Sequence, residues 1–154
     1  MLIRESLTIR APIERIWDLL DDPEKRKLWT EPDAEIEYLT PVDPQDKLGL
    51  RYRLRLRTGD KLSEFTGEVT AWERPHHLAV RLQQKYIDWQ YDYRLTTIPD
   101  GTRFDYIQET IMKVPWIVRA VFTPVRLLRN RQLKPAVRRG MEKLKRLAEQ
   151  GNEA

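Results

Sequence analysis

The strongest constraint on the fold is a run of alternating residues around one tight turn. Residues 48–72 read LGLRYRLRLRTGDKLSEFTGEVTAW, in which apolar and charged positions alternate on both sides of Gly59-Asp60. Such alternation predicts half-buried strands, and a two-residue turn that contains glycine joins them as an antiparallel hairpin. If residue 58 pairs with residue 61, the cross-strand pairs are Arg55–Glu64, Arg51–Glu68, Leu54–Phe65 and Leu50–Val69. Because a shift by one residue would destroy the pairs on both faces, this register is fixed and the chain must contain an antiparallel sheet.

Further strands and two short helices flank this hairpin. Between Leu2 and Arg10 apolar and polar residues alternate, with Glu5 as the one charged residue on the apolar face. Pro12 suits the first turn of a helix, and Pro23 can open a second one. The expected elements are strands 2–10, 35–39 and 78–86, helices 13–20 and 23–28, and a second hairpin around residues 98–101. With a four-residue loop, the pairs of this second hairpin are Leu95–Phe104, Tyr93–Tyr106 and Arg94–Asp105.

The C-terminal part of the chain is expected to be helical and carries most of the positive charge. From Leu133 onward, apolar or small residues recur at helical spacing: Val137, Gly140, Met141, Leu144 and Ala148. The formal net charge of the chain is +4, but residues 113–146 hold eleven Lys or Arg against one Glu, a local charge of +10. Pro124 and Pro135 should start or kink helices. Packing the apolar stripe of this helix on the apolar face of the sheet would bury both surfaces.

Composition narrows the class of protein. With 154 residues and a hydrophobic content of 40%, the chain suits a single domain with a sizeable core. Cysteine is absent, which excludes disulfides, thiolate nucleophiles and cysteine-based metal sites. No apolar run reaches membrane-spanning length, and the first ten residues lack the apolar core of a signal peptide. We therefore expect a cytoplasmic protein.

Three motifs connect the chain to a known superfamily. Residues 9–23 follow the pattern I-x-A-P-x-x-x-I-W-x-L-L-x-D-P, DGT stands at 100–102, and RRGMEKLKRLAE stands at 138–149. These motifs resemble the START-like superfamily, also called SRPBCC, which includes polyketide cyclases and lipid-transfer proteins. The resemblance implies an α+β helix-grip fold, in which a curved antiparallel sheet wraps around a long C-terminal helix and two short helices close one end. It also implies one START-like ligand-binding domain over residues 1–150, followed by a disordered tail at 151–154.

The resemblance also implies a ligand cavity between the sheet and the C-terminal helix. In the predicted registers, the face of the sheet turned toward that helix combines aromatic side chains with a few neutral polar ones, which is typical of small-molecule pockets. The candidate ligand-binding residues are Tyr52, Leu54, Phe65, Leu82, Gln84, Tyr86, Trp89, Tyr91, Tyr93, Tyr106, Gln108 and Thr110. The alternative is that these side chains simply fill a core. We prefer the cavity mainly because the resemblance implies one. The tyrosines and glutamines add to this, since buried hydroxyls and amides need hydrogen-bond partners.

The alternating arginines at 51, 53, 55 and 57 allow two interpretations. They could follow a phosphate backbone as part of a nucleic-acid interface. They could also form a solvated outer face with cross-strand ion pairs to Glu64 and Glu68. The opposing acids favour the second interpretation, and we expect no nucleic-acid partner.

Motifs for catalysis and metal binding are weak. His76 and His77 are adjacent, so on a strand they would point in opposite directions and would not form a metal site together. Asp88 and Glu109 could act as acid or base only if the last hairpin slipped, because in the preferred register both face solvent. We therefore nominate no catalytic residue, no metal and no cofactor.

Residues 115–128 combine dense apolar positions with interleaved arginines. The candidate membrane or lid residues are Trp116, Ile117, Arg119, Val121, Phe122 and Arg126. One interpretation is an interfacial helix that contacts anionic lipid, or a lid at the mouth of the cavity. The other is a helix whose apolar side packs on the sheet. The sequence leaves both open.

The sequence favours a non-catalytic carrier or sensor of a hydrophobic small molecule, such as a lipid, an isoprenoid or a polyketide-like compound. In one version, this carrier is loaded at the inner face of an anionic membrane. A cyclase or aromatase that uses the same cavity is the first alternative, and it would need an inward-facing acid or base beside the ligand. A partner-binding module that acts through the basic C-terminal helix is the second.

Overall fold

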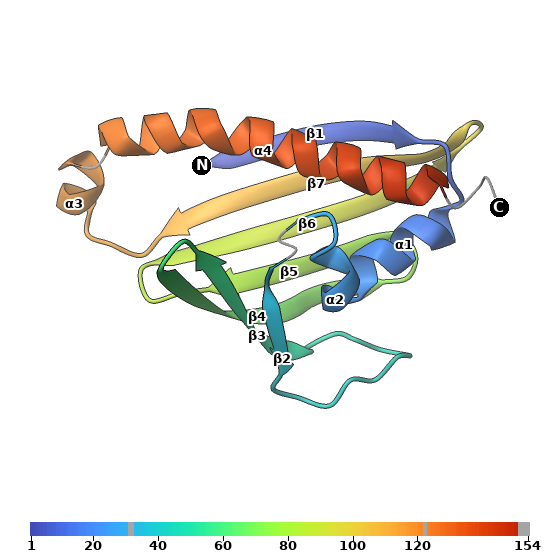
Figure 1. Cartoon of the computed structure of the whole chain (residues 1–154), viewed down its shortest axis with the longest axis horizontal. Coiled ribbons are helices and arrows are strands. Elements are labelled where there is room, and N and C mark those ends of the chain that lie inside the picture. The colour runs from blue at the N-terminus through green and yellow to red at the C-terminus, as the bar shows by residue number, and fades with distance from the viewer. Residues whose placement is uncertain (31–32, 122, 151–154) are drawn as a thin grey trace.

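An antiparallel sheet crossed by one long helix dominates the fold (Figure 1). The computed structural model describes residues 1–30, 33–121 and 123–150, without the side chains of residues 58, 123–130 and 132. In chain order its elements are β1 (Leu2–Ile9), α1 (Ile13–Asp21), α2 (Pro23–Arg26), β2 (Glu35–Tyr38), β3 (Arg51–Thr58), β4 (Lys61–Glu73), β5 (His77–Gln83), β6 (Ile87–Ile98), β7 (Gly101–Met112), α3 (Trp116–Val121) and α4 (Thr123–Gln150). The seven strands follow the order β1-β7-β6-β5-β4-β3-β2, which confirms the α+β helix-grip fold. The predicted tail at 151–154 lies outside the described residues.

Both predicted hairpin registers are confirmed. The pairs between β3 and β4 include Thr58–Lys61, Arg55–Glu64 and Leu54–Phe65. The pairs between β6 and β7 include Tyr93–Tyr106, Arg94–Asp105 and Leu95–Phe104. The second hairpin is tighter than expected, because its ladder continues to Ile98 opposite Gly101 and leaves a turn of two residues instead of four.

The arginines of β3 lie on the face of the sheet away from α4. Arg53 places its Nε 2.9 Å from Glu64 of β4 and its Nη1 3.3 Å from Glu37 of β2. Arg55 lies 3.4 Å and 3.6 Å from the same two carboxylates. Because these charges are partly exposed, each pair adds little stability. The geometry agrees with the interpretation of this strand as a solvated outer face.

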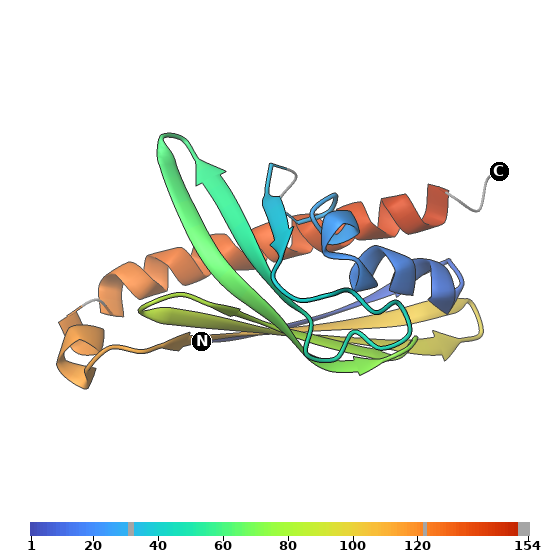
Figure 2. The ribbon, with the colours of Figure 1, turned by 90° about the horizontal axis from the view of Figure 1, so that it is seen from below.

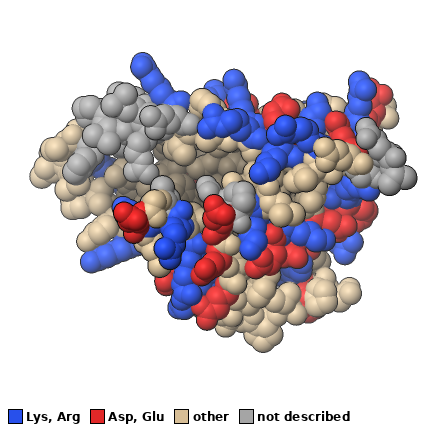
Figure 3. All heavy atoms as spheres, in the orientation of Figure 1, with Lys and Arg blue, Asp and Glu red and all other residues tan. Residues whose placement is uncertain are grey.

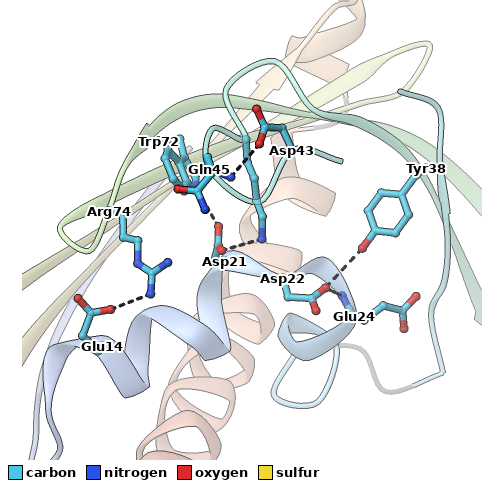
Figure 4. Close-up of polar contacts among 10 residues, drawn as sticks. Glu14, Asp21, Asp22, Glu24, Tyr38, Asp43, Gln45, Trp72 and Arg74 are labelled. Carbon is cyan, nitrogen blue, oxygen red and sulfur yellow. Dashed lines mark hydrogen bonds and ion pairs between the residues drawn. The ribbon is translucent and has the colours of Figure 1, made fainter. Parts of the chain in front are cut away.

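The short helix α1 closes one end of the sheet with a fully buried apolar face. Residues at helical spacing form this face: Ile16, Trp17 and Leu20. Trp17 meets Trp72 of β4 edge to face, with ring centroids 6.0 Å apart. Asp21 at the end of α1 accepts hydrogen bonds from Trp72 Nε1 and from Lys47 Nζ, both at 2.7 Å (Figure 4). These contacts attach α1 to the sheet and to the loop before β3.

The one-turn helix α2 is held by its N-cap. Pro23 fills the first helical position, and the Asp22 carboxylate accepts from the Glu24 N–H at 2.9 Å (Figure 4). The Tyr38 hydroxyl donates to the same carboxylate oxygen at 3.4 Å. Burial and the charges of Asp22 and Glu24 raise the pKa of Tyr38 to about 12, so the hydroxyl keeps its proton. The cap thus links α2 to β2 and sets the position of Arg26 at the end of the turn.

The sheet is strongly curved (Figure 2). Strand β4 contains a bulge between Val69 and Ala71, and bulges bend a strand and increase its twist. In Figure 2 the β3–β4 hairpin leaves the plane of the other strands and rises past α4. The concave side of the sheet therefore faces α4.

Helix α4 runs the length of the sheet, from α3 at one end to α1 at the other (Figure 1). Among the described side chains of α4, the buried ones are Met141, Leu144 and Ala148. The helix continues through Pro135. Glu5, the charged residue on the apolar face of β1, lies 3.2 Å from Arg138 Nε and 4.0 Å from Lys134 Nζ of α4. The residue that interrupts the alternation of β1 thus has its partners on the covering helix.

Candidate ligand-binding cavity

A cavity of about 480 Å³ lies between the concave side of the sheet and α4. Its described walls come from α2 and the segment after it, from β2, β3, β5, β6 and β7, and from one side of α4. Figure 3 shows the hollow beneath α4, with side chains other than Lys, Arg, Asp and Glu on its floor. The volume falls in the range of about 300–1,000 Å³ that is typical of small-molecule pockets.

Seven of the predicted ligand-binding residues lie on the wall of this cavity. They are Tyr52, Leu54, Leu82, Tyr91, Tyr93, Tyr106 and Gln108. Six of them come from strands of the two predicted hairpins, β3, β6 and β7, and Leu82 comes from β5. That these residues contact a ligand stays a prediction.

The other five candidates lie outside the described lining. They are Phe65, Gln84, Tyr86, Trp89 and Thr110. Phe65 and Trp89 pack edge to face with ring centroids 4.9 Å apart, and so contact each other instead of lining the cavity. Tyr86 is 58% exposed, because β5 ends at Gln83 and not at residue 86 as expected. Alternation predicts the face of a strand, but the position along the strand relative to α2 and α4 decides which residues line the cavity.

Tyrosines supply much of the polar surface of the wall. The Tyr106 hydroxyl donates to Gln108 Oε1 at 2.8 Å, and both side chains are buried. The rings of Tyr93 and Tyr106 pack with centroids 5.6 Å apart. Burial raises the pKa of Tyr52, Tyr93 and Tyr106 above the ordinary value of tyrosine. These hydroxyls are therefore neutral near pH 7 and offer hydrogen bonds without charge.

Sequence reasoning missed Arg26, a buried arginine of the cavity wall. Arg26 is only 7% exposed, and its Nη2 donates to the Tyr52 hydroxyl at 3.1 Å. Its Nη1 is buried and has no hydrogen-bond partner among the described residues. The sequence DPEKRKLW predicts a short, charge-rich helix, and its composition does not indicate a buried arginine. The available signal was the spacing of three from Pro23, which places both residues on one buried face of α2.

Sequence reasoning also gave no role to Gly67, which makes room for Tyr52. Gly67 of β4 pairs with Tyr52 of β3, and a Cβ atom at position 67 would lie 2.4 Å from Tyr52 Cζ. The missing side chain therefore lets the Tyr52 ring lie across β4. The available signal was a glycine inside an otherwise regular strand pattern.

The described lining of the cavity contains cations and no carboxylate. Its charged members are Arg26, Lys27, Arg139 and Lys143. Lys27 forms an ion pair of 2.7 Å with Glu24, and the two α4 residues are exposed. Arg26 is the buried cation of this set, in contact with the apolar and aromatic part of the wall.

The prediction that Asp88 faces solvent is wrong. It lies on the face away from α4, as the register requires, but it is only 1% exposed because long side chains cover it. Its carboxylate oxygens lie 2.8 Å from Arg81 Nη2 and 2.8 Å from Lys113 Nζ. Burial by itself would raise the pKa of Asp88, but the hydrogen bonds and charges of Lys113 and Arg81 hold it below its usual value. Glu109 is exposed, and neither carboxylate faces the cavity.

Helix α3 presents apolar side chains to solvent. Trp116 is 76% exposed, Ile117 58% and Val121 69%, so these residues do not pack on the sheet. Arg119 donates to the Met112 carbonyl. None of these residues lines the cavity in the described structure, which does not support a lid over its mouth. The predicted residue Phe122 and the side chain of Arg126 lie outside the described part of the chain.

Two further kinds of site can be assessed for the described residues. No group of three or more His, Cys, Asp or Glu side chains lies close enough there to hold a metal ion. His77 instead places its Nε2 2.9 Å from Asp92 of β6. No helix in the described part of the chain is both long and apolar enough to span a bilayer.

The curved sheet, the long covering helix and the cavity between them define a helix-grip protein of the START-like class. The chain belongs to the family described as polyketide cyclase / dehydrase and lipid transport, whose model matches residues 2–149. This match confirms the resemblance inferred from the three sequence motifs.

Solved structures with low sequence identity share the fold. Protein SA2116 of unknown function from Staphylococcus aureus superposes with a TM-score of 0.77 at 11% identity, covering 100% of this chain and 96% of that one. Protein TTHA0849 from Thermus thermophilus gives 0.70 at 17% identity, covering 94% of both chains. The di-domain ARO/CYC StfQ from the steffimycin biosynthetic pathway gives 0.75 at 10% identity, covering 99% of this chain and 52% of that one. No curated protein sequence matches the chain significantly.

Proposed function

We propose that the protein binds and carries a hydrophobic small molecule in the cavity between the sheet and α4. The observation that carries this proposal is a cavity of about 480 Å³ with an apolar and aromatic wall, in a family that includes lipid transport. A concave site of this size, with aromatic side chains and a few polar groups, is the usual form of a small-molecule site. The candidate cargo is a lipid, an isoprenoid or a polyketide-like compound.

A non-catalytic carrier fits the wall better than a cyclase does. The family description and the di-domain ARO/CYC neighbour keep a cyclase or aromatase as the alternative. Such an enzyme needs a general base beside the ligand. The described lining offers no Asp, Glu or His, and burial keeps its tyrosines protonated. Incubation with polyketide substrates that yields a cyclised product would favour the enzyme.

Filling the cavity tests the carrier proposal. Leu54 lines the cavity, and a tryptophan there should occupy part of its volume. The neutral fluorescent probe N-phenyl-1-naphthylamine should bind the native protein, and L54W should weaken that binding about tenfold or more through lost space. The matched control is L62W, at an exposed leucine of the neighbouring strand. Unchanged binding in a folded L54W variant would contradict a ligand site at this place.

We further propose that the cargo is exchanged at an anionic membrane. The exposed apolar residues of α3 support this step, because such a surface is costly in water and can insert shallowly at a bilayer. The local charge of +10 over residues 113–146 would attract anionic headgroups. In Figure 1, α3 lies at the end of the sheet opposite α1.

A further inference from the structure

We propose that Arg26 and Tyr52 form a subsite for the carboxylate of an apolar acid bound in the cavity. This inference rests on the proposed function, since it assigns a chemical class to the small molecule that the cavity holds. The acid would place its carboxylate against α2 and its apolar body along the aromatic strands β6 and β7.

The first step of the inference is the unbalanced charge of Arg26. An arginine side chain is permanently charged, and burying a charge is costly unless it is paired. Arg26 is only 7% exposed and lines the cavity. Its partner in the described structure is a neutral hydroxyl, and its Nη1 donates to nothing there. The described lining contains no carboxylate that could balance it. An anionic group of the ligand would supply the missing partner.

The second step is the orientation of the Tyr52 hydroxyl. Its oxygen accepts from Arg26 Nη2, so its own proton remains to be donated. Burial raises the pKa of Tyr52, which keeps that proton in place, although the charge of Arg26 partly opposes the effect. The ring lies 5.8 Å from the guanidinium carbon and reaches this position because Gly67 leaves the space open. Arg26 Nη1 and the Tyr52 O–H thus form a pair of adjacent donors.

Two donors, one of them charged, match the two oxygens of a carboxylate. A carboxylate carries one negative charge, which balances one guanidinium. A phosphate monoester carries nearly two charges and three terminal oxygens, more than the one charge and the two donors that Arg26 and Tyr52 together offer. The wall also includes apolar and aromatic residues such as Leu54, Leu82 and Tyr91, which suit a hydrocarbon body.

Isothermal titration calorimetry with three decyl probes tests the subsite. Decanoate, 1-decanol and decyl phosphate share one apolar chain and differ in the head group. The wild-type protein should bind decanoate more tightly than both others. R26Q should weaken decanoate binding by about tenfold to a hundredfold, the range expected for a charge-assisted hydrogen bond, and should change decanol binding less than about twofold. Y52F, which keeps the ring, should weaken decanoate binding by a smaller factor.

R103Q is the matched control, because Arg103 of β7 is an exposed arginine outside the described lining of the cavity. It should leave the preference for decanoate nearly unchanged. Thermal unfolding of the free proteins verifies that each variant folds. R26Q loses the hydrogen bond to Tyr52 but also removes a buried charge that has no charged partner in the described lining. Its free energy of unfolding should therefore fall by no more than the contribution of that one hydrogen bond.

The outcomes separate this inference from the proposed function. If decanol and decanoate bind the wild type equally, or if R26Q keeps the preference, the carboxylate subsite is wrong while the hydrophobic carrier stands. Tighter binding of decyl phosphate than of decanoate would also overturn the assignment. If neither a decyl probe nor N-phenyl-1-naphthylamine binds, the carrier function itself is wrong, and the subsite with it.

Discussion

At the scale of single residues, the wall of the cavity depends on a tyrosine ring that occupies the space left open by a glycine. Gly67 and Tyr52 form such a pair across β3 and β4. In a strand, alanine is ordinarily favoured over glycine by about 0.5–1 kcal/mol. Here the new Cβ would lie 2.4 Å from the Tyr52 ring, so the ring must move. The steric cost exceeds the gain in propensity.

We therefore predict that G67A destabilises the protein by about 1–3 kcal/mol, the usual cost of overpacking a filled site. Urea unfolding measures this change. T66A on the same strand serves as control, because Thr66 is only half-buried. G67A should also reduce the preference for decanoate by displacing the Tyr52 hydroxyl. A variant as stable and as selective as wild type would mean that the ring has room to relax.

At the scale of elements, α3 differs from every other helix of the described structure in having no buried residue. Its apolar residues Trp116, Ile117 and Val121 are exposed together. Helix α1, in contrast, uses the same residue types to close the sheet. The contrast arises because α1 packs against the sheet and α4, whereas α3 lies past the end of the sheet (Figure 1).

We predict that the protein floats with vesicles rich in phosphatidylserine and does not float with pure phosphatidylcholine vesicles. Each well-placed basic residue near the surface adds roughly 1 kcal/mol, and this attraction weakens as salt shortens the Debye length. W116A with I117A should reduce flotation about tenfold through lost insertion, while T8A, on the exposed face of β1, should not. No flotation on anionic vesicles at low salt would show that α3 has another role.

At the scale of the whole molecule, the sheet uses its two faces differently. The concave face carries the cavity, and the opposite face carries ion pairs, including the buried carboxylate of Asp88 with Arg81 and Lys113. The lowered pKa of Asp88 means that the folded state binds its proton less tightly than the unfolded state does. Its stabilising contribution is therefore present above the unfolded pKa of about 3.9 and is lost as pH falls through the lower folded pKa.

D88N should thus destabilise the protein by about 1–3 kcal/mol at pH 7, because two partly exposed cations lose their buried acceptor. The difference from wild type should shrink as pH falls below about 4, because the Asp88 carboxylate of the unfolded wild-type chain takes up a proton there while that of the folded protein is still charged. Urea unfolding at pH 7 and pH 3 measures both values. An equal difference at the two pH values would show that packing, and not charge, explains the loss. Probe binding should be unaffected, because Asp88 faces away from the cavity.

The sequence determined the elements, the two hairpin registers and the family. These features depend on local signals: alternation on both faces of Arg51–Thr58, the Gly59-Asp60 turn, and the proline-bounded helices at the start of the chain. Because the side-chain period of a strand is two, the registers also determined which residues point toward α4. Seven of twelve candidate residues lie on the cavity wall for this reason.

Which inward residues border the cavity, and which charged residues are buried, depends on how the curved sheet and α4 pack together. Phe65 and Trp89 alternate correctly but pack on each other and lie outside the described lining. Glu5, Arg26 and Asp88 look like surface residues in the sequence, yet each lies against an element distant along the chain. Burial of a charge depends on neighbours that the curved sheet and α4 bring together, and no local pattern encodes those neighbours.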